Sequence, residues 1–216
     1  TIDGEYTKDI DDAISIKKKG NNYILGVHIA DVSHYVTEDS ILDLCAYNRG
    51  TSVYLANSVI PMLPKELSNG ICSLNPNVDR LTQTCEMEIT DKGEVVNYSI
   101  YPSVIHSKYK MTYTNVNKIL YDDLEVKQQY KDIVDDILIM HELQLVLHKV
   151  RDKMGSINFE TIEPKFIFDD DGNISDLKVR EREDAEKLIE EFMLVANQVV
   201  ATHVFNQKLP FLYRIH

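Results

Sequence analysis

The sequence predicts an α+β domain with antiparallel or mixed β-sheets and two long helices. Two observations lead to this prediction: β-rich segments joined by short turns in the first half of the chain, and helical periodicity in the second half. The 216 residues are enough for a real core, and a hydrophobic content of 44% is ordinary for a globular protein. Since no linker or internal repeat divides the chain, residues 1–216 are expected to belong to one domain.

Alternating segments around short turns predict two β-hairpins. The first covers residues 13–31 around a Gly-Asn-Asn turn, and the second covers residues 81–105 around an Asp-Lys-Gly-Glu turn. Between them, residues 38–50 are interpreted as a short helix. Residues 59–80 hold three of the six prolines and show no period, which predicts an ordered but irregular loop.

Apolar residues at three- and four-residue spacing predict the two long helices. The first lies within residues 124–155, and the second starts near Glu183. A shorter helix is expected at residues 115–121, with Thr114 as its cap. Residues 156–179 are expected to return to strands around an Asp-Gly turn.

The composition limits the class of partner. A formal net charge of −12 disfavours nucleic acid and anionic membranes, unless divalent cations offset the carboxylates. No run of about 18 apolar residues occurs, so no membrane span is expected. Cys45, Cys72 and Cys85 form no CxxC pair, which favours neither a zinc site nor disulfides and indicates a reducing, cytoplasmic location.

The opening stretch TIDGEYTKDIDDA gathers four aspartates: Asp3, Asp9, Asp11 and Asp12. Carboxylates a few ångströms apart repel one another, so one keeps a proton unless a cation lies between them. Mg²⁺ prefers carboxylate oxygens, and two such ions about 3.5–4 Å apart can clamp the attacking and leaving oxygens of a phosphoryl transfer. From spacing alone, a solvated acidic loop explains the four aspartates about as well as a metal site does. An EF-hand is excluded because neither Asp-rich stretch has glycine at its sixth position.

Several other polar residues are interpreted as structural. His28, Asp31 and His34 lack a plausible fourth ligand for a tetrahedral zinc site. Arg80 could contact phosphate or pair with local carboxylates, and we favour a structural role. The lysines at residues 17–19 indicate a solvated turn rather than an RNA groove.

Seven segments occur in order along the chain: TIDGEYTKDIDDA, HIADVSHYV, GTSVYL, IPMLP, LSNGICSLNPNVDRLT, SKYKMTY and LIEEFMLVAN. Together they resemble the catalytic RNB domain of the ribonuclease R and ribonuclease II family, and their sequences are closer to ribonuclease R than to ribonuclease II. The resemblance covers effectively the whole chain. It implies an RNB-type fold and a processive 3′-to-5′ exoribonuclease that hydrolyses single-stranded RNA to 5′-mononucleotides with Mg²⁺.

The same resemblance implies the site residues. Asp3, Asp9, Asp11 and Asp12 would be the catalytic aspartates and would hold one or two Mg²⁺ ions, with Mn²⁺ as a substitute. Asp3 and Asp12 would be the surest ligands, Asp9 would support them, and Asp11 would be needed for the chemical step.

Four further positions are implied to bind RNA. Tyr54 and Phe159 match aromatic residues that hold the terminal bases, and Tyr113 and Glu190 match residues that contact ribose. Without the resemblance, the three aromatic residues are interpreted as packing and Glu190 as part of a solvated helix face.

The resemblance also implies missing parts. Family members carry cold-shock domains before this region and an S1 domain after it, and the RNB domain itself continues with an arginine-rich motif that has no match here. We therefore expect a partial RNB domain, truncated on its C-terminal side, that is weak or inactive alone. No small-molecule cofactor other than the divalent metal is expected.

Two competing interpretations remain open. One is a catalytically silent RNA-binding or scaffolding module of the same family, for which a broken set of aspartates would be the sign. The other is a different metal-dependent phosphoesterase that acts on DNA or nucleotides. The sequence does not determine the oligomeric state.

Overall fold

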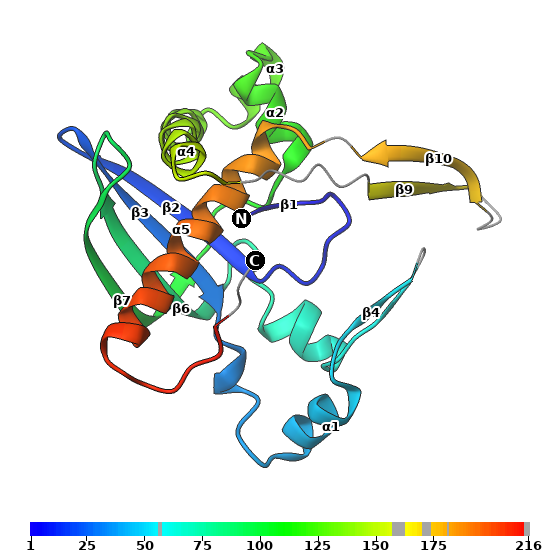
Figure 1. Cartoon of the computed structure of the whole chain (residues 1–216). Helices are drawn as coiled ribbons and strands as arrows, with labels where there is room; N and C mark the ends of the chain where they lie inside the picture. The colour runs from blue at the N-terminus through cyan, green and yellow to red at the C-terminus, as the bar shows by residue number, and fades with distance from the viewer. Residues whose placement is uncertain (56–57, 157–162, 170–173, 181, 214–216) are drawn as a thin grey trace.

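The structure is a computed structural model that describes residues 1–55, 58–156, 163–169, 174–180 and 182–213 (Figure 1). In these residues a sheet of antiparallel strands packs against helices, and smaller two-stranded sheets surround this body. The predicted α+β class is therefore confirmed.

The central sheet has four antiparallel strands in the order β2-β3-β6-β7. The strands are β2 (Asp12–Lys19), β3 (Asn22–Ala30), β6 (Asp79–Ile89) and β7 (Val95–His106). They form the two predicted hairpins. In the first, Lys19 is opposite Asn22, and Gly20 in the turn between them has a φ of 61°, a conformation that glycine adopts without strain.

Alternate residues of the inner strands point into one core. Tyr23, Leu25 and Val27 of β3 are at most 1% exposed, and Met87 and Ile89 of β6 are 0% exposed. This period of two is the pattern expected of strands with one buried face. Side chains from the helices cover that face and complete the core.

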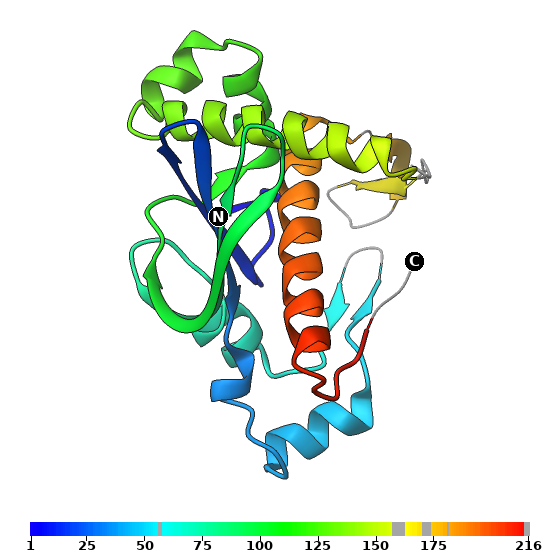
Figure 2. The ribbon, with the colours of Figure 1, turned by 60° about the vertical axis from the view of Figure 1, so that its left-hand side comes forward.

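The helices are α1 (Ile41–Arg49), α2 (Tyr113–Leu120), α3 (Leu124–Gln129), α4 (Val134–Lys153) and α5 (Asp184–Asn206). The two long helices of the prediction are α4 and α5, and α4 crosses the first half of α5 (Figure 2). The helix predicted within residues 124–155 is divided into α3 and α4 by a turn at residues 130–133.

The cap predicted for α2 was wrong by two residues. Thr112, not Thr114, is the N-cap, and its hydroxyl accepts a hydrogen bond from the backbone N–H of Asn115 at 3.1 Å. The helix starts earlier than expected because Thr112 is extended and ends strand β8 (Met111–Thr112). Thr114 is exposed inside the first turn of the helix.

Helix α5 is the one helix among the described residues that is long and apolar enough to cross a membrane by length and composition. Its residues Ala185, Leu188 and Phe192 are 0% exposed because they pack into the core. Core helices pass the same test, and 39% of the apolar window of α5 is buried, so core packing explains part of its apolar character.

Three further strand pairs complete the described fold. They are the parallel pair of β1 (Ile2–Asp3) with β8, the hairpin of β4 (Val53–Tyr54) with β5 (Val59–Ile60), and the hairpin of β9 (Glu163–Phe168) with β10 (Ile174–Arg180). The last two project from the same side of the molecule (Figures 1 and 2).

The segment predicted as an irregular loop, residues 59–80, contains β5, a helical turn at Glu66–Ile71 and the first residues of β6. The three cysteines are free, Cys45 exposed and Cys72 and Cys85 buried, as their spacing indicated.

Candidate active site

A two-residue parallel ladder brings distant parts of the chain together at the acidic stretch. Asp3 of β1 is paired with Thr112 of β8, and the Met111 N–H donates to the carbonyl of Thr1 at 2.9 Å. Tyr113 follows Thr112 directly as the first residue of α2. The structure therefore places Tyr113 beside the strand that carries Asp3, as a ribose contact near the aspartates requires.

The loop after Asp3 is held by hydrogen bonds at its start. Asp3 Oδ1 accepts from the Gly4 N–H at 2.6 Å and from the Thr7 hydroxyl at 3.1 Å. The Lys110 ammonium, from the segment before β8, donates to the carbonyl of Thr7 at 2.5 Å. These contacts fold the loop back over β1, so that Asp9 returns toward Asp3.

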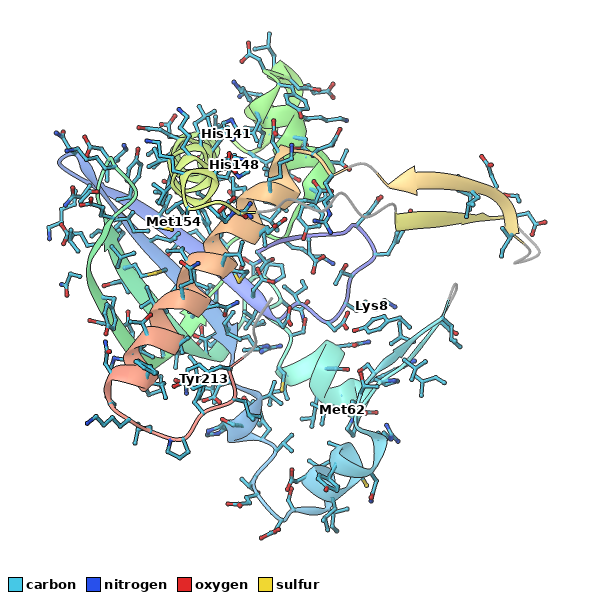
Figure 3. The ribbon with its side chains drawn as sticks, viewed as in Figure 1. Lys8, Met62, His141, His148, Met154 and Tyr213 are labelled. Carbon is cyan, nitrogen blue, oxygen red and sulfur yellow. The ribbon has the colours of Figure 1, made fainter. Side chains whose placement is uncertain are left out.

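The end of the same loop is fixed by Ser73. The Ser73 hydroxyl donates to the carbonyl of Lys8 at 2.7 Å and accepts from the N–H of Ile10 at 3.1 Å. Lys8 is labelled on this loop in Figure 3. Arg80 in turn donates from Nε to the carbonyl of Ser73 at 2.8 Å. Arg80 therefore supports the loop through backbone contacts, which agrees with its structural interpretation.

Asp12 is the most perturbed of the four aspartates. It opens β2, where it is paired with Ile29, and its Oδ2 atom is buried with no hydrogen-bond donor among the described residues. Burial raises the pKa of Asp12 to about 6, and the negative charges of Asp11 and Asp3 add to this effect. A buried carboxylate oxygen without a donor requires a proton or a cation.

Asp9 and Asp11 are exposed at the end of the loop. The pKa of Asp11 is raised, first by desolvation and then by the charges of Asp3 and Asp9. The charges of Asp3 and Asp9 therefore act on Asp11, and those of Asp3 and Asp11 act on Asp12.

The chemistry of this set fits a hard divalent cation. All four groups offer carboxylate oxygens, which Mg²⁺ prefers, and a cation would relieve the repulsion that raises the pKa values of Asp11 and Asp12. In the part of the chain that the structure describes, no three His, Cys, Asp or Glu side chains are already arranged to hold a metal ion. The aspartates therefore form an acidic cluster whose side chains would need to adjust around the ion.

The predicted RNA-binding residues lie on separate elements. Tyr54 is the last residue of β4 and is 70% exposed. Glu190 lies on α5, where its Oε2 atom is 3.6 Å from Nη1 of Arg182. Phe159 lies outside the residues that the structure describes. Tyr113 is thus the residue of this group that a described strand pairing places beside the acidic loop.

Asn117 joins the helix of Tyr113 to the helix of Glu190. Its amide donates to Glu183 Oε2 at 2.6 Å, and its carbonyl oxygen accepts from the N–H of Ala185 at 2.9 Å. These bonds attach the start of α5 to α2. Sequence reasoning had no signal for this link, because a buried Asn on a short helix does not reveal its partner.

Three of the residues interpreted as structural have local partners in the structure. His28 is hydrogen-bonded to the hydroxyls of Ser15 and Thr84 at 3.0 and 2.8 Å, so both of its ring nitrogens have a partner. Lys18 and Lys19 form ion pairs with carboxylates, Glu142 at 3.1 Å and Glu88 at 2.8 Å, in the hairpin turn region.

Curated relatives match this chain over its whole length. Ribonuclease R 1 of Lactococcus lactis subsp. lactis is 52% identical over 217 residues, and the match covers 100% of this chain and 27% of that relative. Ribonuclease R of Thermotoga maritima is 54% identical over 218 residues, with 100% and 31% covered. The chain therefore spans less than a third of the length of these two relatives.

Solved structures give the same result. RNase R of Mycoplasma genitalium in complex with ribose methylated single-stranded RNA superposes with a TM-score of 0.92 at 33% identity, covering 100% of this chain and 34% of that chain. Yeast Ssd1, described as a pseudonuclease, has a TM-score of 0.69 at 17% identity over 91% of this chain and 23% of its own, which shows the fold alone. The RNB domain model matches residues 1–216, and on this evidence the chain belongs to the RNB domain family.

Proposed function

We propose that this chain is the metal-binding part of a Mg²⁺-dependent exoribonuclease that degrades single-stranded RNA processively from its 3′ end to 5′-mononucleotides. One observation carries the proposal: the four aspartates of TIDGEYTKDIDDA lie on β1, on the anchored loop and at the start of β2, where the buried Oδ2 atom of Asp12 has no donor among the described residues. Membership of the RNB family and a similar structure solved with single-stranded RNA support it.

The aspartates have separate roles in this proposal. Asp3 and Asp12 hold the cation, one ion or two, with Asp9 in support, and Mn²⁺ can replace Mg²⁺. A bound ion would activate water and offset negative charge on the phosphate. Asp11 is exposed and directly precedes Asp12 in the chain, so its carboxylate can hydrogen-bond a water that enters from the solvent. It is therefore assigned to orient the attacking water and accept its proton.

Recognition of RNA is assigned to groups around the loop. Tyr113 and Glu190 contact ribose near the scissile bond, which would separate RNA from DNA through the 2′-hydroxyl. Tyr54, which is 70% exposed, and Phe159 stack on bases, and stacking tolerates every base in a processive enzyme.

The test is a cleavage assay with 5′-labelled single-stranded RNA and Mg²⁺. Asp11→Asn should reduce the rate by about 10²–10⁴-fold, because a positioned proton acceptor contributes that much. Asp91→Asn is the matched control, since Asp91 is an exposed aspartate in the turn between β6 and β7. Equal rates for the wild type and Asp11→Asn would refute the catalytic role of the cluster.

The 216-residue chain on its own is expected to cleave weakly. It spans 27–34% of the ribonuclease R relatives compared above, and it contains no match to the arginine-rich motif that the family uses at the phosphate. The assay is therefore run on this chain and on a longer one that includes that motif. A longer chain that gains no activity would contradict this part of the proposal.

A silent RNA-binding module is the second candidate. The likeness to Ssd1 shows that a pseudonuclease can share this fold. The complete set of aspartates argues against it here. If both chains bind RNA and neither shortens it, the silent module is the better description. Cleavage of a 2′-deoxy substrate at an equal rate would instead favour a phosphoesterase without ribose selection.

A further inference from the structure

Glu191 carries a buried carboxylate that the proposed chemistry does not use. Its side chain on α5 is 3% exposed. Its Oε1 atom accepts hydrogen bonds from His148 Nδ1 at 2.7 Å and from Arg151 Nη2 at 2.7 Å, and both partners lie on α4. Figure 3 labels His148 where α4 meets α5. An ionised group at this depth persists only with such partners.

Arg151 binds the Glu191 carboxylate through more than one of its nitrogen atoms, an arrangement called the fork below, and it also reaches the segment after α4. Its Nε atom also donates to both carboxylate oxygens of Glu191, at 3.0 and 3.2 Å, and its Nη1 atom donates to the hydroxyl of Ser156 at 2.9 Å. Hydrogen bonding to Glu191 is the first cause of the raised pKa of Arg151, and the charges of Glu190 and Asp152 add to it. The guanidinium therefore connects the end of α4, the middle of α5 and the segment after α4.

The fork holds one side of α5 against α4, next to the apolar face that packs into the core. Consecutive helical residues are separated by about 100°, so a Glu191 side chain locked toward α4 leaves Glu190 on the flank of the helix. The Glu190 side chain is 42% exposed there, and its ion pair with Arg182 is a loose 3.6 Å contact between two partly exposed groups. Such a pair orients a side chain weakly. The direction of Glu190 therefore depends on how firmly its backbone is held, by the apolar face of α5 and by the fork at Glu191.

We propose that Glu191 and Arg151 are positioning residues for the contact between Glu190 and ribose. The inference rests on the proposed function, because it assumes that contact. A bidentate arginine–carboxylate pair gives directional as well as electrostatic restraint, and a polar contact to a ligand depends on how firmly its backbone is held. Neither residue touches RNA in this proposal; both act through Glu190.

The test compares binding of an oligoribonucleotide with binding of the oligodeoxyribonucleotide of the same sequence. All variants are made in the 216-residue chain with Asp11→Asn, so that the RNA stays intact during titration. Glu190→Ala should lower the ribo-to-deoxy affinity ratio by about 2- to 10-fold, the range for one net hydrogen bond. Glu191→Gln should lower the ratio in the same range. Adding Glu191→Gln to Glu190→Ala should lower it no further, because both changes remove one contact.

Two more variants separate positioning from stability. Arg151→Lys keeps the positive charge but cannot form the fork, so it should also lower the ribo-to-deoxy affinity ratio. This variant tests the inference if Glu191→Gln fails to fold. Lys19→Ala is the control, because it breaks the ion pair with Glu88 in a distant hairpin and should leave the ratio unchanged.

The outcomes distinguish the inference from the proposed function. If Glu190→Ala lowers the ratio while folded Glu191→Gln and Arg151→Lys keep it, with only a lower melting temperature, the fork is merely structural and the inference fails. If the parent chain has no preference for ribose, or if Glu190→Ala keeps the preference, the proposed ribose contact fails and the inference fails with it.

Discussion

At the scale of one residue, Asp12 has a buried carboxylate whose ionisation lowers the folding stability. Its pKa is raised from 3.8 to about 6, first by burial and then by Asp11 and Asp3. Because the folded state binds its proton more tightly than the unfolded state, folding stability falls as the pH rises between these two values. Above about pH 6 the whole of this loss of folding stability is present, and a cation at the site would offset it.

Without divalent metal, the wild type should therefore lose stability between about pH 4 and pH 6, by an amount of up to about 3 kcal/mol for this group. Asp12→Asn has no carboxylate to ionise at this position, so most of that loss of stability should disappear. The variant should then be more stable than the wild type at pH 7. Urea unfolding in the presence of a chelator at both pH values measures this. Adding Mg²⁺ at pH 7 should stabilise the wild type and leave Asp12→Asn unchanged. If Asp12→Asn is less stable than the wild type at pH 7, ionisation of the Asp12 carboxylate does not destabilise the folded chain.

At the scale of one element, α2 shows why a helix boundary is difficult to read from sequence. The stretch Thr112-Tyr113-Thr114 offers two threonines of equal capping chemistry, and Thr114 was the expected cap. The pairing of β8 with β1 keeps Thr112 extended, and the N-cap residue must be extended for its hydroxyl to reach the helix. A tertiary contact therefore decided between two locally equivalent residues.

Thr112→Ala should destabilise the protein by about 1 kcal/mol, because the N–H of Asn115 loses its acceptor. Thr114→Ala is the matched control and should change stability by less than about 0.5 kcal/mol, since Thr114 is exposed. Both values come from urea midpoints at one pH. Equal effects of the two substitutions would contradict the assignment of the cap.

Across the whole molecule, the candidate site depends on how separate helices are joined. Helix α5 has no side-chain cap of its own, since its N-cap residue Glu183 makes no such bond. Asn117 of α2 supplies the acceptor for the N–H of Ala185 and is itself 3% exposed. One buried amide therefore joins the helix that begins with Tyr113 to the helix that carries Glu190.

Asn117→Ala should cost about 1–3 kcal/mol, because it leaves the buried N–H of Ala185 without an acceptor. Asn97→Ala, at an exposed position of β7, is the control and should stay within about 0.5 kcal/mol of the wild type. Thermal and urea unfolding measure both. A near-neutral effect of Asn117→Ala would mean that α5 is anchored by its apolar face alone.

The local features of this protein could be read from the chain itself. The two hairpins of the main sheet, the helices α4 and α5 and the acidic opening stretch follow from periodicity, turn residues and composition, which are properties of neighbouring residues. The RNB resemblance likewise depended on segments in a fixed order, and the family match over residues 1–216 confirms it.

The arrangement of the site was decided by tertiary contacts. The pairing of Asp3 with Thr112, the amide bridge of Asn117 and the fork between Arg151 and Glu191 each join residues far apart in the sequence. Glu190 and Glu191 are adjacent and chemically identical, yet one is partly exposed and the other is buried in an ion pair. Periodicity identifies the apolar face of a helix, but the partner of a charged residue at the edge of that face depends on which element packs there. Only the folded chain determines that partner.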